Sequence, residues 1–463
     1  MRRVLFLLAF GAAVFANAAD APLSLKKALS EGLRGNLDIK RSELGSEGID
    51  AQVNAAFRSY LPQLTASGSV TRLWANDPTM VPNYPAWIAT LATANLPPSM
   101  QDMKVPFDPK NAMLEIPINW NVQGDLKLTQ FLYVPQAITG IRMAKKGKEI
   151  DALGKQELRE GIIYGISMQY WTIVYMEENM EVLQKSKANL GKTRGAVAAM
   201  VGQGIAKKSD LNTMDINLAS LSTQIDNLEV QIQTQKDALL QIMGRSPGEA
   251  IDLTDRLSVD FRNSENISGD PLHSSITLKR MEQQLKLSEL NIDLTSEKIY
   301  PNLVAFASYG TQAAGEKNPL FDSPKDKFKD NGTVGVSLTI PIFDGLSNSA
   351  DRSYARIQKR QLEIDMEKQR LSLQATYETA KSTLLKAQSL VERNRENAKL
   401  SEENYLMKEL EYKEQVATIT DLLTADNNMQ TARSNLINAL YTEKTAELAL
   451  EQVLGILRNR AGE

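Results

Sequence analysis

Two segments of this sequence are far longer than an ordinary globular helix and contain almost nothing that would interrupt one. Residues 134–200 contain no proline after Pro135, and residues 346–413 contain neither proline nor glycine. At a rise of 1.5 Å per residue, helices of this length extend about 100 Å. Because most helical stability in proteins comes from packing one face against a partner, the sequence predicts long helices that pair with one another.

The apolar residues of these segments, and of the segments that return from them, recur every seven residues, as in coiled coils. The repeats comprise Tyr377, Leu384, Val391, Ala398, Tyr405 and Tyr412; Leu211, Leu218, Ile225, Ile232 and Leu239; and Ala425, Ala432, Ala439, Ala446 and Val453. Residues 134–243 and 346–457 are therefore each predicted to form an antiparallel helical hairpin.

The two hairpins belong to an internal duplication. Residues 209–211 (Ser-Asp-Leu) correspond to 420–422 (Thr-Asp-Leu), and 243–244 (Met-Gly) to 454–455 (Leu-Gly), at an offset of about 211 residues. Each half is predicted to contain a helix, two strands and a helical hairpin. The predicted organisation is a first repeat over 19–245, a connector over 246–275, a second repeat over 276–457 and a C-terminal tail over 458–463.

Apolar and polar residues alternate in the predicted strands, which cover residues 62–74, 113–133, 301–311 and 332–343. Alternation places the two kinds of side chain on opposite faces of a sheet. Val336, Leu338 and Ile340 are expected on one face, and Ser337 and Thr339 on the other. A soluble, half-buried sheet gives this pattern, and so does a transmembrane barrel with its apolar face toward lipid. The alternation alone leaves both open.

Residues 1–18 have the features of a secretory signal peptide. Arg2 and Arg3 precede an apolar run over residues 4–15, and residues 16–18 (Ala-Asn-Ala) have the small-x-small form that signal peptidase cleaves. The run is too short to span a bilayer as a helix, which needs about 20 residues. The mature chain is expected to be exported, and any membrane crossing by it is expected to use β-strands.

The composition argues against an enzyme and against a nucleic-acid-binding protein. The chain has no cysteine, one histidine (His273) and a formal net charge of −3. These counts exclude a thiol nucleophile and a multi-histidine metal site, and they leave little room for Ser-His-Asp chemistry. The charge also offers no basic surface for nucleic acid. We expect neither catalysis nor a cofactor.

Several short motifs, found in order along the chain, resemble those of the outer-membrane efflux protein family, the TolC-like outer membrane factors. They are the opening segment 23–29 (LSLKKAL), the Leu-Pro-x-Leu step at 61–64, the paired Ser/Thr-Asp-Leu segments and the closing Leu-Gly at 454–455. The resemblance implies a homotrimer in the outer membrane of a Gram-negative-type bacterium. Each chain would give four strands to a twelve-stranded β-barrel, and the helices would form a large periplasmic α-barrel.

The resemblance also implies a gate and an adaptor-contact surface where the helices of each hairpin meet. The residues matching the gate are Ser209, Asp210, Tyr412, Asp421 and Thr424. The residues matching the adaptor-contact tip are Gly202, Gly204, Ala206, Lys207, Gln415, Ala417 and Thr418. By this resemblance the Tyr412 hydroxyl bonds the Asp210 carboxylate in the closed state, and Asp421 lines the constriction. The sequence departs from the family at Ala417, where the gate has an arginine, and at Thr424, where it has a second aspartate.

These residues also have plainer interpretations. Ser209 or Asp210, and Thr420 or Asp421, are ordinary N-caps for the returning helices, and Tyr412 falls on the heptad seam. The residues themselves do not decide between the two interpretations.

The function that the resemblance implies is an exit duct for a tripartite efflux system. Its partners would be a periplasmic adaptor (membrane fusion) protein and an inner-membrane pump of RND or ABC type. Two alternatives stay open: the exit duct of a one-step (type I) protein secretion system, and a periplasmic coiled-coil scaffold without a channel.

Overall fold

The computed structural model describes residues 21–74, 79–94, 97, 99–100, 113–116, 118–258, 269–322 and 328–461. The chain forms two compact units. The helical unit comprises Met1–Asp50, Lys146–Leu287 and Gln358–Glu463, and the strand unit comprises Ala51–Lys145 and Ser288–Ile357. The predicted signal peptide, residues 1–18, lies outside the described residues.

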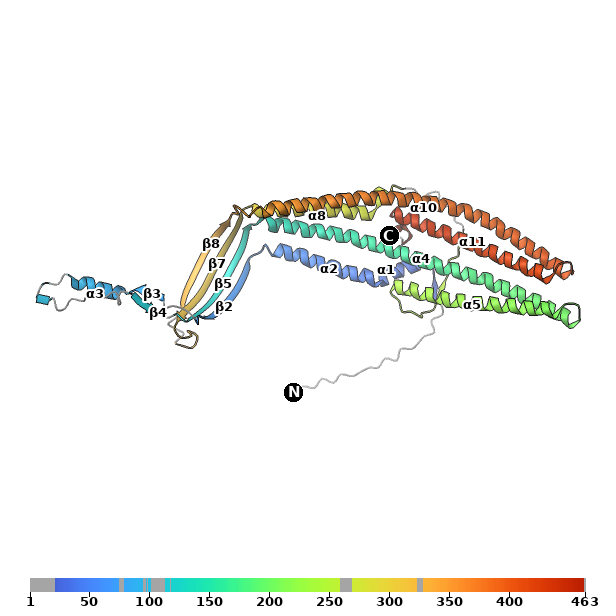
Figure 1. The fold of residues 1–463 in the computed structure, drawn as a ribbon, viewed down its shortest axis with the longest axis horizontal. Helices are drawn as coiled ribbons and strands as arrows, with labels where there is room; N and C mark the ends of the chain where they lie inside the picture. The colour runs from blue at the N-terminus through green and yellow to red at the C-terminus, as the bar shows by residue number, and fades with distance from the viewer. Residues whose placement is uncertain are drawn as a thin grey trace, which may run out of the picture. The chain divides into compact units, whose positions relative to one another are not determined.

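Two helical hairpins dominate the helical unit (Figure 1). Helix α4 (Pro135–Gly202) is followed by α5 (Lys208–Met243), and α10 (Ser347–Lys413) by α11 (Ile419–Val453). The shorter helices α2 (Leu37–Arg58) and α8 (Ile276–Ser296) precede the strands of the first and second repeats. The prediction of long helices is confirmed. Among the described residues, no helix is both long enough and apolar enough to cross a membrane.

The heptad positions predicted from the sequence form the seams between these helices. Leu384, Val391, Ala398 and Tyr405 of α10 are buried, as are Ile225, Ile232 and Leu239 of α5. Near the hairpin turns one apolar cluster draws residues from all four long helices, namely Leu190, Val197, Met214, Leu221, Tyr405, Ile419, Leu422, Ala425 and Met429. The two hairpins therefore pack against each other through a shared core at this end.

The start of the described chain is fixed to the connector. Strand β1 (Ala21–Leu23) pairs in parallel with β6 (Ile251–Leu253), and α1 (Leu25–Gly35) follows it. The hydroxyl of the buried Tyr170 donates to the Leu23 carbonyl at 2.8 Å and also bonds Asp255 at 2.8 Å. The connector also contains α7 (Pro271–Ser274), and the tail begins with α12 (Arg458–Ala461).

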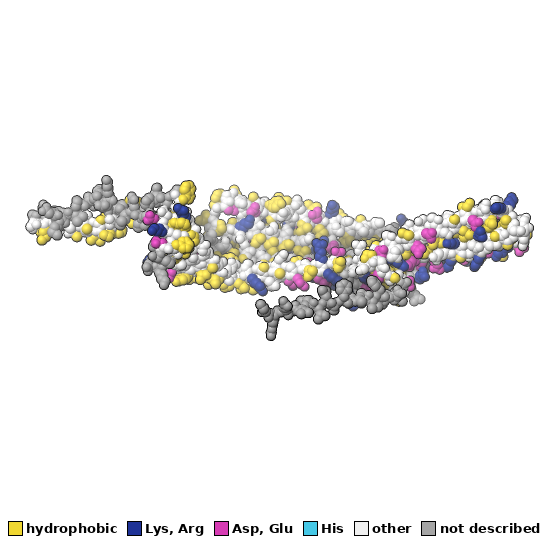
Figure 2. Space-filling view, turned by 90° about the horizontal axis from the view of Figure 1, so that it is seen from below, with side chains coloured by type: hydrophobic (Ala, Val, Ile, Leu, Met, Phe, Trp, Pro, Cys, Tyr) yellow, Lys and Arg dark blue, Asp and Glu magenta, His cyan; other side chains and the backbone are white. Residues whose placement is uncertain are grey.

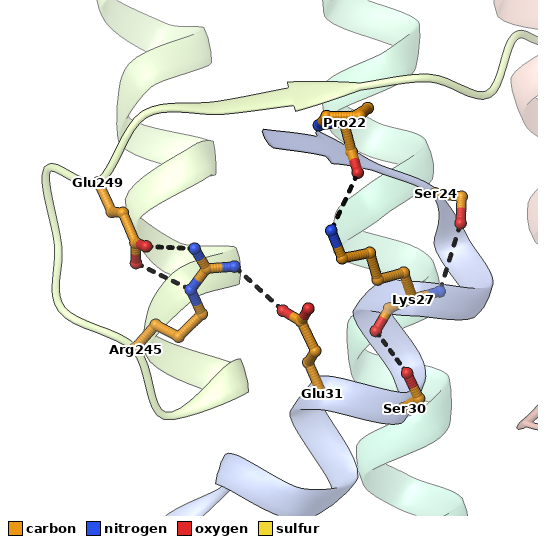
Figure 3. Close-up of polar contacts among 7 residues, drawn as sticks. All are labelled: Pro22, Ser24, Lys27, Ser30, Glu31, Arg245 and Glu249. Carbon is orange, nitrogen blue, oxygen red and sulfur yellow. Dashed lines mark hydrogen bonds and ion pairs between the residues drawn. The ribbon is translucent and has the colours of Figure 1, made fainter. Parts of the chain in front are cut away.

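The turn after α5 is held close to α1. Arg245 is ion-paired with Glu249, and its Nη1 lies 3.2 Å from Glu31 of α1 (Figure 3). Gly244 has a φ of +74°, and a Cβ at this position would overlap the Gly35 carbonyl oxygen. This close approach of two backbones explains why glycine follows α5.

The strand unit contains a four-stranded antiparallel sheet in the order β2-β5-β7-β8. Its strands are β2 (Gln63–Arg72), β5 (Trp120–Tyr133), β7 (Asn302–Gly315) and β8 (Lys329–Thr339). Each repeat therefore supplies two adjacent strands, and β2 and β8 are the two edges. A 3-10 turn, η3 (Glu297–Ile299), leads from α8 toward β7.

Proline and small residues are frequent in residues 75–111, between the first two predicted strands. Part of this stretch lies outside the described residues, but the described part contains β3 (Thr79–Pro82) and α3 (Tyr84–Ala94). Strand β3 pairs with β4 (Met113–Ile116) in a separate two-stranded sheet. Residues 113–133, predicted as one strand, are thus divided between β4 and β5.

One face of the four-stranded sheet is apolar and exposed in the single chain, as the hydrophobic side chains over the strands in Figure 2 indicate. Val334, Val336 and Leu338 of β8 are 87%, 61% and 59% exposed. On the alternate positions, Thr333 and Ser308 share a hydrogen bond of 2.6 Å between their hydroxyls. The predicted alternation is present, but Ile340 lies beyond the end of β8, so its assignment to the strand was wrong.

Candidate functional site

The turns of the two hairpins have the same backbone geometry, as the duplication requires. Gly204 has a φ of 74° and Gln415 a φ of 58°. The amide of Ile205 donates to the Met200 carbonyl at 2.9 Å, and the amide of Val416 donates to the Glu411 carbonyl at 2.8 Å. Equivalent residues again differ by about 211 positions. A non-glycine residue at positive φ is uncommon, so Gln415 marks the second turn as the more constrained of the two.

The N-cap residues predicted from the sequence were wrong in both hairpins. Helix α5 has Lys207 at its N-cap, with no side-chain hydrogen bond to the helix, and α11 has Thr418. The reason is geometric: only two residues separate the left-handed position of each turn from the N-cap, so each helix starts earlier than expected. Asp210 and Asp421 consequently lie in the first turn of their helices, three residues after the cap.

Asp421 completes a capping box with Thr418. The Thr418 hydroxyl donates to Asp421 Oδ2 at 2.7 Å, and the Thr418 amide donates to the same oxygen at 2.9 Å. These bonds, with a smaller contribution from Lys408, hold the pKa of the Asp421 carboxyl below its usual value. Asp421 is therefore an exposed, firmly ionised carboxylate at the hairpin turn.

No hydrogen bond joins Tyr412 and Asp210 in the described structure of the single chain. Tyr412 is half-buried at the edge of the shared apolar cluster. Burial and then the negative charge of Asp210 raise the pKa of its phenol. Asp210 accepts a hydrogen bond of 3.2 Å from Ser209 Oγ. The charge of Asp210 therefore acts on the Tyr412 phenol, and the gate role of the two residues stays a prediction.

The other expected site residues lie in the first turns of α11, at the end of α4 and in the two hairpin turns. The Thr424 hydroxyl donates to the Thr420 carbonyl at 2.7 Å, so its hydrogen bond lies within its own helix, α11. The expected adaptor-contact residues occupy the end of α4 and the two turns, and five of them are exposed: Gly202, Gly204, Lys207, Gln415 and Thr418. Ala206 and Ala417 are half-buried. Among the described residues, no group of three His, Asp or Glu side chains is placed to hold a metal ion.

A buried polar contact between the hairpins was not predicted from the sequence. Ser186 of α4 donates to Asp426 of α11 at 2.6 Å, and both residues are buried. Asp426 directly follows the heptad residue Ala425, and this adjacency was the only signal that could have placed its carboxylate near the seam.

Comparisons with known proteins agree with this architecture. Residues 269–456 match a family model described as Outer membrane efflux protein. No curated protein matches the sequence. Among solved structures, the outer membrane protein VceC of Vibrio cholerae is similar at 16% identity and a TM-score of 0.68, over 93% of this chain and 96% of that chain.

Two further solved structures show the same likeness. The CmeC outer membrane channel of Campylobacter jejuni is 14% identical with a TM-score of 0.69, over 96% of this chain and 90% of that chain. The open state of the MtrE outer membrane channel of Neisseria gonorrhoeae is 17% identical with a TM-score of 0.70, over 93% of this chain and 89% of that chain.

The family model covers nearly all of the second repeat, and the structural likeness extends over both. The resemblance drawn from the sequence motifs is thereby confirmed. This chain carries an outer membrane efflux protein domain at residues 269–456 and has the fold of the TolC-like outer-membrane channels.

Proposed function

We propose that this chain is the outer-membrane exit duct of a tripartite efflux system. It would pass substrates from an inner-membrane pump and a periplasmic adaptor across the periplasm and the outer membrane. No reaction is assigned to it, because the pump would supply the energy. The observation that carries the proposal is the four-stranded sheet, which has an exposed apolar face and open edges at β2 and β8.

The sheet supports assembly as a homotrimer. Open sheet edges are not tolerated in lipid, because each unpaired backbone group costs several kcal/mol there. Four strands are too few to close around a lumen. Pairing β8 of one copy with β2 of the next, in three copies, gives a closed twelve-stranded barrel with Val334 and Val336 toward lipid and Thr333 toward the lumen.

The hairpin turns support a gate. Asp421 would place one carboxylate per chain at the constriction, three in the trimer, because Thr424 stands where the family has a second aspartate. Tyr412 and Asp210 would form the link that opening breaks. Ala417 cannot supply the arginine link of the family, so fewer contacts hold this gate closed.

The exposed turns support contact with a periplasmic adaptor. Gly202, Gly204, Lys207, Gln415 and Thr418 are all accessible in the single chain. The pump behind the adaptor would be of the RND or ABC type. Ala206 and Ala417, which are half-buried, would contribute through the shape of the turns.

The duct of a type I protein secretion system is the second candidate, since it needs the same barrel, tunnel and adaptor surface. An export assay separates the two roles. In cells from which the gene is deleted, loss of efflux should raise the intracellular level of small toxic solutes. Expression of the gene from a plasmid should return the solutes to their normal level. Loss of a secreted protein from the medium, with unchanged solute levels, would overturn the efflux role and favour the secretion role.

A further inference from the structure

A carboxylate is buried where the two hairpins pack together, and the proposed gate does not use it. Asp426 of α11 is 4% exposed, and its Oδ2 accepts the hydrogen bond from Ser186 of α4, which is 3% exposed. In the described part of the chain, the other oxygen, Oδ1, is buried without a hydrogen-bond partner. The contact joins residues 240 positions apart, so it ties the first hairpin to the second.

The groups facing Asp426 from α10 and α5 do not compensate a negative charge. Tyr405 of α10 lies in the same cluster, where burial, then Asp426, then Glu409 raise the pKa of its phenol to about 12. Helix α5 contributes Met214 and Leu221, which are apolar. Neither the neutral Tyr405 phenol nor these apolar side chains carry a positive charge that could balance a carboxylate in this seam.

The cations near Asp426 are engaged with other carboxylates. Arg433, two turns further along α11, acts on Asp426 electrostatically, but its Nη2 donates to Glu402 of α10 at 2.7 Å. Lys185, next to Ser186 on α4, lies 2.7 Å from Glu181. Ser186 is thus the direct hydrogen-bond donor to Asp426.

We propose that Asp426 and Ser186 form a proton-operated lock between the two hairpins, closed when Asp426 is protonated and weakened when Asp426 is ionised. A neutral carboxyl group fits the packed seam at little cost. A buried carboxylate with one unpartnered oxygen lacks the solvation that water would give it. Because separation of the hairpins returns this carboxylate to water, loss of the proton favours separation.

The direction of the pH dependence follows from burial. Burial raises the pKa of Asp426 above its ordinary value of 3.8, while the Ser186 hydrogen bond and Arg433 act in the opposite sense. The packed state therefore binds the proton more tightly than the separated state. The contribution of this proton to the packed state is complete below the ordinary carboxyl pKa and is lost as pH rises through the raised pKa. Over that range the equilibrium constant between packed and separated hairpins changes by at most about tenfold per pH unit.

A distance measurement tests the lock without any assumption about transport. Because the chain has no cysteine, Ala206→Cys and Gln415→Cys introduce one spin-label pair across the two turns of the full chain. Labelled chain is diluted into unlabelled chain, and the distance distribution is recorded at about pH 4.5 and about pH 8. The short-distance population should fall severalfold at the higher pH.

Three variants make the result decisive. Asp426→Asn keeps the shape without the charge and should abolish the pH response, whereas Asn in place of the exposed Asp226 of α5 should keep it. Ser186→Ala removes the donor that favours the ionised form, so the response should move to higher pH. A pH-independent distance in the unsubstituted chain, or a response unaltered in both Asp426→Asn and Ser186→Ala, would overturn the proposal. If Asp426→Asn does not fold, Ser186→Ala alone decides.

An effect of this lock on conductance rests on the proposed function, but the distance measurement does not. A pH-dependent distance in a chain that forms no channel would support the lock and contradict the exit duct. Channel activity together with a distance that does not change with pH would support the exit duct and contradict the lock.

Discussion

Thr418 and Asp421 exchange hydrogen bonds at the start of α11: the Asp421 amide donates to Thr418 Oγ1 at 3.2 Å, and the Thr418 amide donates to Asp421 Oδ2 at 2.9 Å. The equivalent residues of α5 are Lys207 and Asp210, and Lys207 offers no side-chain cap. The second hairpin turn is therefore secured by side chains where the first depends on its backbone.

Thr418→Ala should destabilise the first turn of α11 by about 1 kcal/mol, because it removes the cap's acceptor oxygen. Lys207→Ser, which introduces such an acceptor, should stabilise the start of α5. Hydrogen exchange of the amides in each first turn measures both effects.

The stability that Asp421 gives to the first turn of α11 should depend on pH. Because the pKa of Asp421 is lowered, this stabilisation is complete above the ordinary carboxyl pKa of 3.8 and is lost as pH falls through the lowered pKa. Equal protection in Thr418→Ala and the unsubstituted chain would contradict the capping role.

Tyr412→Phe should raise channel conductance without lowering trimer stability, because it removes only the hydroxyl that would bond Asp210 in the closed assembly. A hydrogen bond to a charged group contributes roughly 1.5–3 kcal/mol, enough to bias a two-state gate by about ten- to a hundredfold. Tyr377→Phe, on the same heptad seam of α10, is the matched control and should change nothing. Conductance that is unchanged in Tyr412→Phe would leave Tyr412 as a packing residue only.

Asp421→Asn should weaken cation preference and block by multivalent cations, because it removes the one carboxylate that each chain would place at the constriction. The N-cap residue Thr418 is unchanged in this variant and keeps its acceptor oxygen for the amide of residue 421, so the fold of the turn should survive. The control is Asn in place of Asp215, an exposed residue of α5 whose Oδ1 lies 2.5 Å from Arg194. Reversal-potential measurements in asymmetric salt give the result. An equal loss of selectivity in both variants would place the selective charge elsewhere.

Val334→Arg should reduce barrel assembly, and Thr333→Arg should not. The two positions are neighbours near the middle of β8 but point to opposite faces, and Val334 is 87% exposed on the apolar one. Arginine at the bilayer midplane on the lipid face costs roughly 2–4 kcal/mol. The yield of heat-modifiable trimers in outer-membrane extracts measures assembly. Similar yields for the two variants would show that the face assignment is wrong.

Periodicity predicted the parts of the fold that repeat. The spacing of Leu384, Val391 and Ala398 follows directly from a coiled-coil seam, and all three are buried. The alternation through Val334 and Val336 likewise follows from a pleated sheet with unlike faces. These patterns are local, so a single sequence is sufficient to recognise them.

Features that depend on the exact path of the backbone could not be predicted in the same way. The N-caps were predicted at the wrong residues because the backbone conformation at Gly204 and Gln415 decides where the next helix begins. The sequence alone does not reveal that conformation, so it did not identify Lys207 and Thr418 as the N-caps. The Ser186–Asp426 contact was missed because it joins polar residues 240 positions apart, on two different hairpins, and a local pattern of apolar residues cannot reveal such a pair. The hydrogen bond between Tyr412 and Asp210, which the family resemblance implies for the closed state, stays a prediction.

The most direct test of the exit duct combines the mass of the detergent-purified protein with its conductance in planar bilayers. We expect a homotrimer that inserts into the bilayer and forms small-conductance pores, because the hairpin turns rest closed. A soluble monomer that forms no pores would contradict the proposed exit duct.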